Sequence, residues 1–80
     1  MTMAKAISER LNFYLFERKL TIYKLAKAAG LPVASVQNLY RGKIKTPTVT
    51  TMYKICLALE ITVGDFFDSP LFEPSNIDPD

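Results

Sequence analysis

At 80 residues the chain has room for one domain with a small core, and about half of its residues are hydrophobic. The absence of histidine removes the commonest metal ligand and general base, and the single cysteine, Cys56, excludes an internal disulfide. All ten basic residues lie between Lys5 and Lys54, whereas the last fifteen residues hold four acids and no base. This distribution is compatible with a polyanionic partner, although solvated helix faces often have a similar composition.

Composition also argues against several classes of function. We expect no enzyme, no catalytic residue, no cofactor and no metal site, because no nucleophile–base pair or carboxylate cluster can be assembled from these residues. A chain this short offers no pocket for a small-molecule substrate. The longest apolar stretch, 55–63, is broken by Glu60 and is too short to span a bilayer, and nothing resembles a secretory signal. We therefore expect a cytoplasmic protein without membrane contact.

The first predicted element is a helix over residues 4–17. Apolar side chains recur there with the 3.6-residue period, at Ile7, Leu11 and Leu15. Phe13 and Phe16 lie outside this stripe, so the helix is apolar on more than one side.

Residues 21–42 are predicted to form two short helices joined by a tight turn. Thr21 is a good N-cap for the first helix, whose inward positions are Leu25, Ala26 and Ala29. Gly30 suits the left-handed conformation that ends a helix, and Pro32 fits the first turn of the next. That second helix is expected over about residues 32–41, with Val36 and Leu39 inward. A helix–turn–helix with glycine in the turn is a unit with a functional signature.

A basic loop, a fourth helix and a short fifth helix are predicted after this motif. Thr48 is the expected N-cap of the fourth helix, with Val49, Met52, Ile55, Cys56 and Leu59 directed inward. Thr62 and Asp65 have the spacing of a capping box for a fifth helix from Val63. The chain is thus predicted to be all-α, with a domain over residues 1–68 and an acidic, proline-containing tail over 69–80.

The spacing of these residues resembles the Cro/cI-repressor-type helix–turn–helix domain, also called the XRE family. The likeness covers roughly residues 5–68 and is carried by Thr21, Leu25, Ala26, Ala29, Gly30, Leu31, Val36, Leu39, Arg41, Gly42, Pro47, Thr48, Ile55, Ala58, Leu59, Glu60, Ile61 and Phe66. The resemblance implies a compact five-helix, lambda-repressor-like domain that binds double-stranded DNA, usually as a homodimer on an operator with two-fold symmetry.

Three positions depart from the family pattern. Where many members have a phosphate-binding Gln after the Thr, this chain has Ile22. Where a buried Arg–Glu pair often joins the first helix to the recognition helix, it has Leu15 and Tyr40. Replacing both partners of a buried pair by apolar groups can be neutral or stabilising. We expect the family fold with an altered set of contacts.

The recognition helix of this architecture enters the major groove. The predicted base-reading residues are Val33, Ala34, Ser35, Gln37 and Asn38. Amide side chains suit adenine and apolar ones suit thymine methyls, so half-sites containing A·T pairs are expected. The alternatives are packing or helix propensity for Val33 and Ala34, and mere surface location for Gln37 and Asn38.

Phosphate contacts are predicted on either side of this helix. The expected residues are Thr21, Tyr23, Lys24, Arg41, Lys43 and Lys45, and the alternative for the last three is a solvated basic loop. A dimer interface is expected at helix four, helix five and the tail, with Tyr53, Leu57, Phe67, Leu71 and Phe72 as candidates. Alternatively, the tail folds back and covers them within one chain.

Two functions from different classes follow. The first is a sequence-specific transcriptional regulator, most simply a repressor that acts by occupying its operator. The second is an antitoxin or protein-interaction adaptor built on the same scaffold, which Ile22 and the acidic tail favour.

Overall fold

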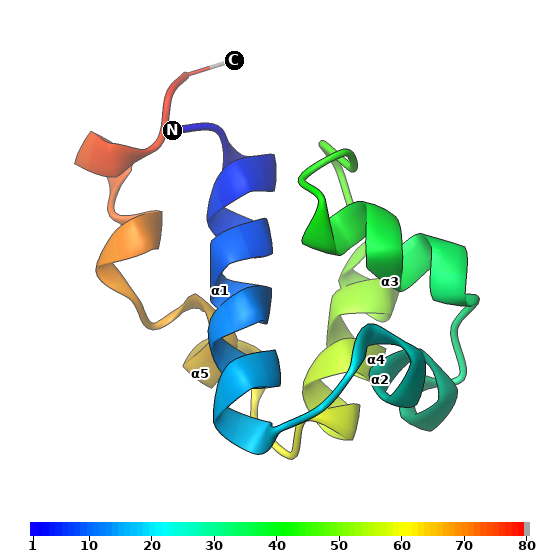
Figure 1. Cartoon of the computed structure of the whole chain (residues 1–80). Coiled ribbons are helices and arrows are strands. Elements are labelled where there is room, and N and C mark those ends of the chain that lie inside the picture. The colour runs from blue at the N-terminus through cyan, green and yellow to red at the C-terminus, as the bar shows by residue number, and fades with distance from the viewer. Residues whose placement is uncertain (80) are drawn as a thin grey trace.

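Five α-helices account for most of the computed structural model, which describes residues 1–79 (Figure 1). They are α1 (Met3–Arg18), α2 (Ile22–Ala29), α3 (Val33–Tyr40), α4 (Val49–Ala58) and α5 (Val63–Phe67). Two single 3-10 turns, Pro70–Phe72 and Pro74–Asn76, follow. No strand is present in residues 1–79, which confirms the all-α prediction, and none of these helices is long and apolar enough to cross a membrane. Asp80, the last residue of the predicted tail, lies outside the described range.

Threonine side chains cap four of the helices: Thr2 at α1, and the three that the sequence predicted. The hydroxyls of Thr21, Thr48 and Thr62 accept hydrogen bonds from backbone amides three residues later, at 2.9–3.1 Å. At α5 the bond is reciprocal, because the Thr62 amide donates to the Asp65 carboxylate at 3.1 Å. Hydrogen bonds from the Thr62 backbone and then its side chain lower the pKa of Asp65.

Left-handed residues follow four helices, and two of these residues, Gly30 and Gly42, are glycines. Gly30 ends α2 with φ +68°, as predicted. Lys19 and Glu60 adopt the same conformation after α1 and α4, with φ 54° and 60°. In each case the following amide returns to a carbonyl in the last turn of the helix, for example Leu20 to Leu15 at 2.9 Å.

The core lies where α1, α2, α3, α4 and α5 converge. Its largest fully buried side chains are Phe66, Leu11, Leu25, Leu39, Ile55, Leu59, Val36 and Cys56. Burial raises the pKa of the Cys56 thiol, and Cys56 is a core residue as predicted. The inward position predicted for Val49 was wrong, since its side chain is 80% exposed. Val49 is the first residue of α4 and lies one turn before Met52, where the buried stripe begins.

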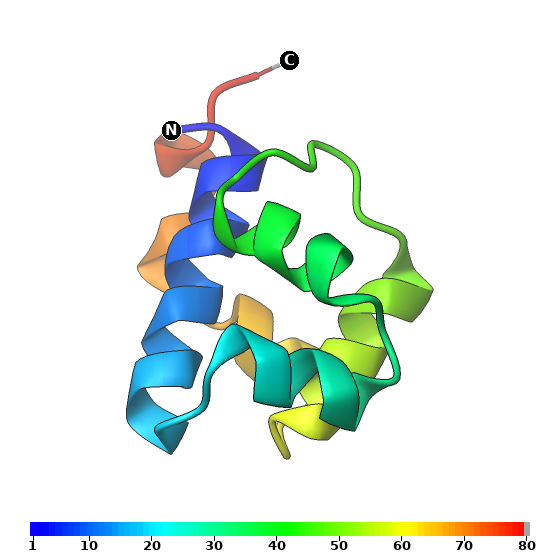
Figure 2. The ribbon, with the colours of Figure 1, turned by 45° about the vertical axis from the view of Figure 1, so that its right-hand side comes forward.

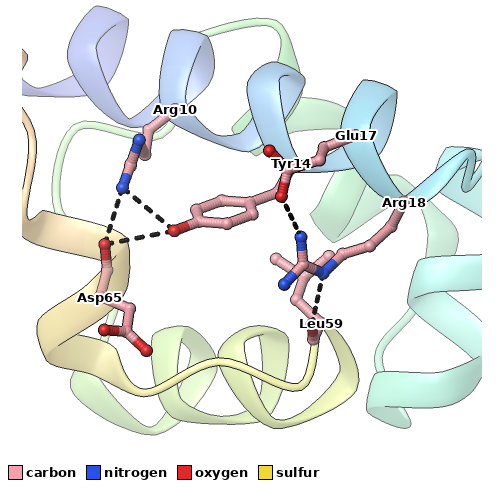
Figure 3. A network of polar contacts seen from close by, with 6 residues as sticks. All are labelled: Arg10, Tyr14, Glu17, Arg18, Leu59 and Asp65. Carbon is pink, nitrogen blue, oxygen red and sulfur yellow. Dashed lines mark hydrogen bonds and ion pairs between the residues drawn. The ribbon is translucent and has the colours of Figure 1, made fainter.

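Two arginines of α1 hold the carboxyl ends of α5 and α4 (Figure 3). Arg10 Nε donates to the Phe66 carbonyl at 2.7 Å, and its Nη2 donates to the Asp65 carbonyl at 2.8 Å. Arg18 Nε donates to the Leu59 carbonyl at 2.9 Å. Helix ends leave such carbonyls without intrahelical partners and carry a partial negative charge, so cationic donors stabilise them.

The tail folds back along α1, on a different side of it from α4 (Figures 1 and 2). Phe72 packs against Phe67 with ring centroids 4.8 Å apart, and both rings are half-buried against the core. The two ends of the chain also meet: the Met1 amino group donates to the Asn76 carbonyl, and the Asp78 amide donates to the Met1 carbonyl, both at 2.8 Å.

Replacing Arg10 by methionine keeps much of the apolar stem but removes the donors at the end of α5. We expect Arg10→Met to lower the free energy of unfolding by about 1–3 kcal/mol, the usual size for hydrogen bonds to a charged group. Urea unfolding followed by circular dichroism measures this. Lys54→Met, at an exposed α4 position, is the control, and equal losses for the two variants would contradict the role given to Arg10.

Candidate nucleic-acid interface

One face of α3 is directed to solvent and the other to the core. Val36 and Leu39 are fully buried on the inner side. The outer side carries residues at i, i+1, i+4, i+5 and i+8, namely Val33, Ala34, Gln37, Asn38 and Arg41. Four of the five residues predicted to read bases therefore share one outward face with the first residue of the basic loop. Ser35 lies beside this face and is partly exposed.

The amide side chains on this face have no partner within the described chain. Gln37 and Asn38 are partly exposed, and no hydrogen bond within residues 1–79 engages either side-chain amide. Each keeps one acceptor and two donors for an external group. The backbone that carries these amides is held in place by the buried side chains of Val36 and Leu39.

The loop from α3 to α4 passes over the start of α1 in the view of Figure 2. It carries three exposed cations, Arg41, Lys43 and Lys45. Within residues 1–79 none of them forms an ion pair. The loop begins in a fixed conformation, because the Lys43 amide donates to the Asn38 carbonyl at 2.9 Å. Gly42 has φ +70°, a conformation that favours glycine.

A hollow of about 400 Å³ lies between this loop and the start of α1. Its lining includes Thr2, Met3, Gly42, Lys43 and Lys45. The first turn of α1 contains no acidic residue, so the positive end of the helix dipole adds to the charge of the lysines. The region is therefore electropositive.

The start of α2 supplies the remaining predicted phosphate-binding residues. Tyr23 and Lys24 are exposed, and Lys27 Nζ lies 5.6 Å from the Tyr23 ring centroid. The Thr21 hydroxyl oxygen is used in capping but its proton remains available. Ile22 is half-buried against the core, so it contributes packing where the family pattern has a polar side chain.

All three departures from the family pattern meet at one place. Leu15, Ile22 and Tyr40 line a shallow hollow of about 300 Å³, together with Asn12, Phe16, Leu20 and Thr21. Leu15 is buried, and the other two are half-buried against the core. The joint between α1 and the end of α3 thus contains no charged side chain at these positions.

Polar contacts at this joint were missed by reasoning from sequence. Ser8 Oγ donates a hydrogen bond to the Tyr40 carbonyl, and the Tyr40 hydroxyl donates to Asn12 Oδ1 at 3.2 Å. The i, i+4 spacing of Ser8 and Asn12 on α1 was a usable signal, but their partner on α3 could not be chosen from the sequence.

The five predicted interface residues are not brought together as one patch. Tyr53 and Leu57 are 55% and 63% exposed, and Val49 extends them into a stripe along α4. Phe67, Leu71 and Phe72 are half-buried on the tail side of the molecule. The tail therefore covers part of the apolar surface within one chain, and α4 retains an open apolar face.

Comparison with known proteins also identifies a helix–turn–helix domain. Residues 10–70 match the sequence model of the family described as the Cro/C1-type HTH DNA-binding domain. The uncharacterized HTH-type transcriptional regulator YozG of Bacillus subtilis (strain 168) is 32% identical over 63 residues, which cover 79% of this chain and 75% of that protein.

Two solved structures are also similar. The prophage Lp1 protein 11 has 38% identity and a TM-score of 0.79, covering 91% of this chain and 96% of that one. An HTH_3 family transcriptional regulator from Vibrio cholerae has 28% identity and a TM-score of 0.74, covering 80% of this chain but 35% of that longer one. With its motif at residues 21–42 and α3 outward, this chain belongs to the Cro/C1-type helix–turn–helix family of DNA-binding transcriptional regulators.

Proposed function

We propose that the chain represses transcription by binding a specific DNA operator as a homodimer, with α3 as the recognition helix. The observation that carries this proposal is the outward face of α3, where two unengaged amides lie directly before three exposed cations. Such a surface combines groups that distinguish bases with groups that attract phosphates. Occupancy of the operator would be the whole mechanism, because it requires only DNA binding.

Base readout is assigned to the outward residues of α3. Gln37 and Asn38 can each donate to and accept from the adenine edge, and Val33 and Ala34 can contact thymine methyl groups. No arginine or lysine lies within Val33–Tyr40, so the commonest guanine contact is missing from this helix. Half-sites that contain A·T pairs in the major-groove contact region are the expected targets.

Phosphate binding is assigned to the groups that flank this face. Arg41, Lys43 and Lys45 follow α3, and Thr21, Tyr23 and Lys24 lie at the start of α2. Contacts of this kind fix the orientation of the protein on the duplex without specifying sequence. Neutralising about four to six phosphates would make binding steeply dependent on salt.

Selection from a random duplex pool tests the proposal directly. We expect enrichment of an A·T-containing motif with two-fold symmetry, and a slope of log K against log salt of about −4 to −5 for each protomer bound. The measurement is sequencing of bound DNA followed by titration at two salt concentrations. A pool without enrichment, combined with a flat salt response, would refute DNA recognition.

Substitutions should separate the two kinds of contact. Gln37→Ala or Asn38→Ala is expected to cost about 1–3 kcal/mol on the selected sequence and to relax preference at one position. Lys43→Ala is expected to weaken all sequences alike and to reduce the salt slope by about 1. Titrations on matched and mismatched duplexes distinguish these effects. Equal behaviour of the two classes of variant would contradict the assignment.

The second protomer is assigned to the open stripe of Val49, Tyr53 and Leu57 on α4. These residues recur at i, i+4 and i+8, so they form one continuous line along the helix. An exposed apolar line of this kind is typical of an interface. The stripe is small, so we expect a weak dimer that operator binding strengthens.

Light scattering during chromatography, with and without operator DNA, tests this assignment. We expect Leu57→Glu to abolish the dimer and to reduce cooperative operator binding, since it buries a charge in an apolar contact. Phe16→Glu is the matched control for the dimer measured without DNA, because Phe16 is 86% exposed on α1, away from this stripe. A strict monomer on operator DNA, or equal loss of the free dimer in both variants, would rule out the α4 interface.

A protein-interaction adaptor or antitoxin remains the second candidate, favoured by the same open stripe on α4. In that case the apolar surface would serve a different protein and the DNA selection would return no motif. The selection experiment therefore decides between the two classes.

A further inference from the structure

Tyr40, the last residue of α3, is bound by α1 at two separate atoms. Ser8 Oγ donates to its backbone carbonyl, and its side-chain hydroxyl donates to Asn12 Oδ1 at 3.2 Å. Ser8 and Asn12 are one turn apart on the same face of α1. One contact therefore fixes the main chain at the end of α3, and the other fixes the side chain of the same residue.

The surroundings of Ser8 show that this joint is closely packed. Ser8 is 9% exposed and is the only buried polar residue of the described chain. A Cβ atom added to Gly42 would lie 3.7 Å from the Ala4 carbonyl oxygen and 3.8 Å from Ser8 Cβ. The backbone that leaves α3 therefore runs directly against the first half of α1.

We propose that Ser8 and Asn12 are positioning residues for the recognition helix, and that they act through Tyr40. The proposal rests on the DNA-binding function given above. At eight residues α3 is too short to be stable alone, and base readout requires side chains held to within about 0.5 Å. The turn at Gly30 holds the amino end of α3, and the two bonds to Tyr40 hold its carboxyl end.

The same contacts set the phosphate-binding loop relative to the base-reading face. Arg41 follows Tyr40 directly, and the Lys43 amide returns to the Asn38 carbonyl within α3. A shift of Tyr40 along α1 would therefore move Asn38 and the loop cations together. Loss of the joint should impair selection of the correct sequence more than general attraction to DNA.

Hydrogen exchange of the free protein tests the joint without DNA. The variants are Tyr40→Phe, which removes only the hydroxyl, and Ser8→Ala, alone and combined. Amides at the end of α3, such as Arg41 and Lys43, are expected to exchange about fivefold to thirtyfold faster in the double variant. The Leu59 amide at the end of α4 should be unchanged.

Tyr14→Phe is the matched control, because the Tyr14 hydroxyl donates a hydrogen bond to the Asp65 carbonyl of α5, on the other side of α1 from α3, at 3.3 Å. It should leave exchange in α3 unaltered. Equal exchange in α3 for Tyr40→Phe and the parent chain would remove Asn12 from the proposal. Unaltered exchange in every folded variant would overturn it, and if Ser8→Ala does not fold, Tyr40→Phe decides alone.

Titration with DNA then separates positioning from simple support of the fold. We expect the double variant to lose about tenfold in affinity for the selected sequence while affinity for an unrelated duplex stays unchanged. A parallel loss on both duplexes would overturn the positioning role. If the parent chain itself selects no sequence, the proposed function fails, whereas faster exchange in α3 would still establish the joint.

Discussion

The fold depends on the contact between the cationic side chains of α1 and the carboxyl ends of two other helices. A five-residue helix such as α5 cannot persist alone, because its few hydrogen bonds do not offset the cost of ordering its backbone. Arg10 supplies donors to its last carbonyls, and Arg18 supplies one to the residue that ends α4. The opposite face of α1 holds the end of α3 through Ser8 and Asn12. Helix α1 thus holds the carboxyl ends of α3, α4 and α5 by hydrogen bonds.

Much of this fold was predictable because its signals are local. Capping by Thr21, Thr48 and Thr62 depends on residues three apart, and the inward stripes of α2 and α3 follow from helical periodicity. Two helix ends lacked such a signal, since Lys19 and Glu60 occupy the left-handed conformation where glycine is usual. The error at Val49 has a similar origin: periodicity gives the direction of a side chain, whereas burial requires another element to cover it.

The residues of the candidate site were predictable from the sequence, whereas the contacts that support them were not. Its outward face on α3 follows from the same periodicity, which leaves Gln37 and Asn38 opposite the buried Val36 and Leu39. The contacts that support this face depend on tertiary structure, so neither the Ser8–Tyr40 bond nor the covering of Phe67 by Phe72 could be read from spacing alone. Periodicity predicts which side chains of a short helix face outward, but it does not predict which residues of other helices hold that helix in place.

The chemistry of the α1–α3 joint has a consequence for DNA binding. Its members are a hydroxyl, an amide, a phenol and apolar side chains, so none carries a charge at neutral pH. Salt screens interactions between exposed charges and leaves neutral hydrogen bonds and apolar packing largely unaffected. The phosphate contacts proposed for the cations of the loop, by contrast, would depend strongly on salt. An ionic pair between α1 and α3 would make both depend on salt, because the conditions that weaken the proposed phosphate contacts would also loosen the proposed recognition helix. With Leu15 and Tyr40 in place of an ionic pair, the proposed function would keep the affinity for DNA, which salt alters, separate from the packing that holds α3.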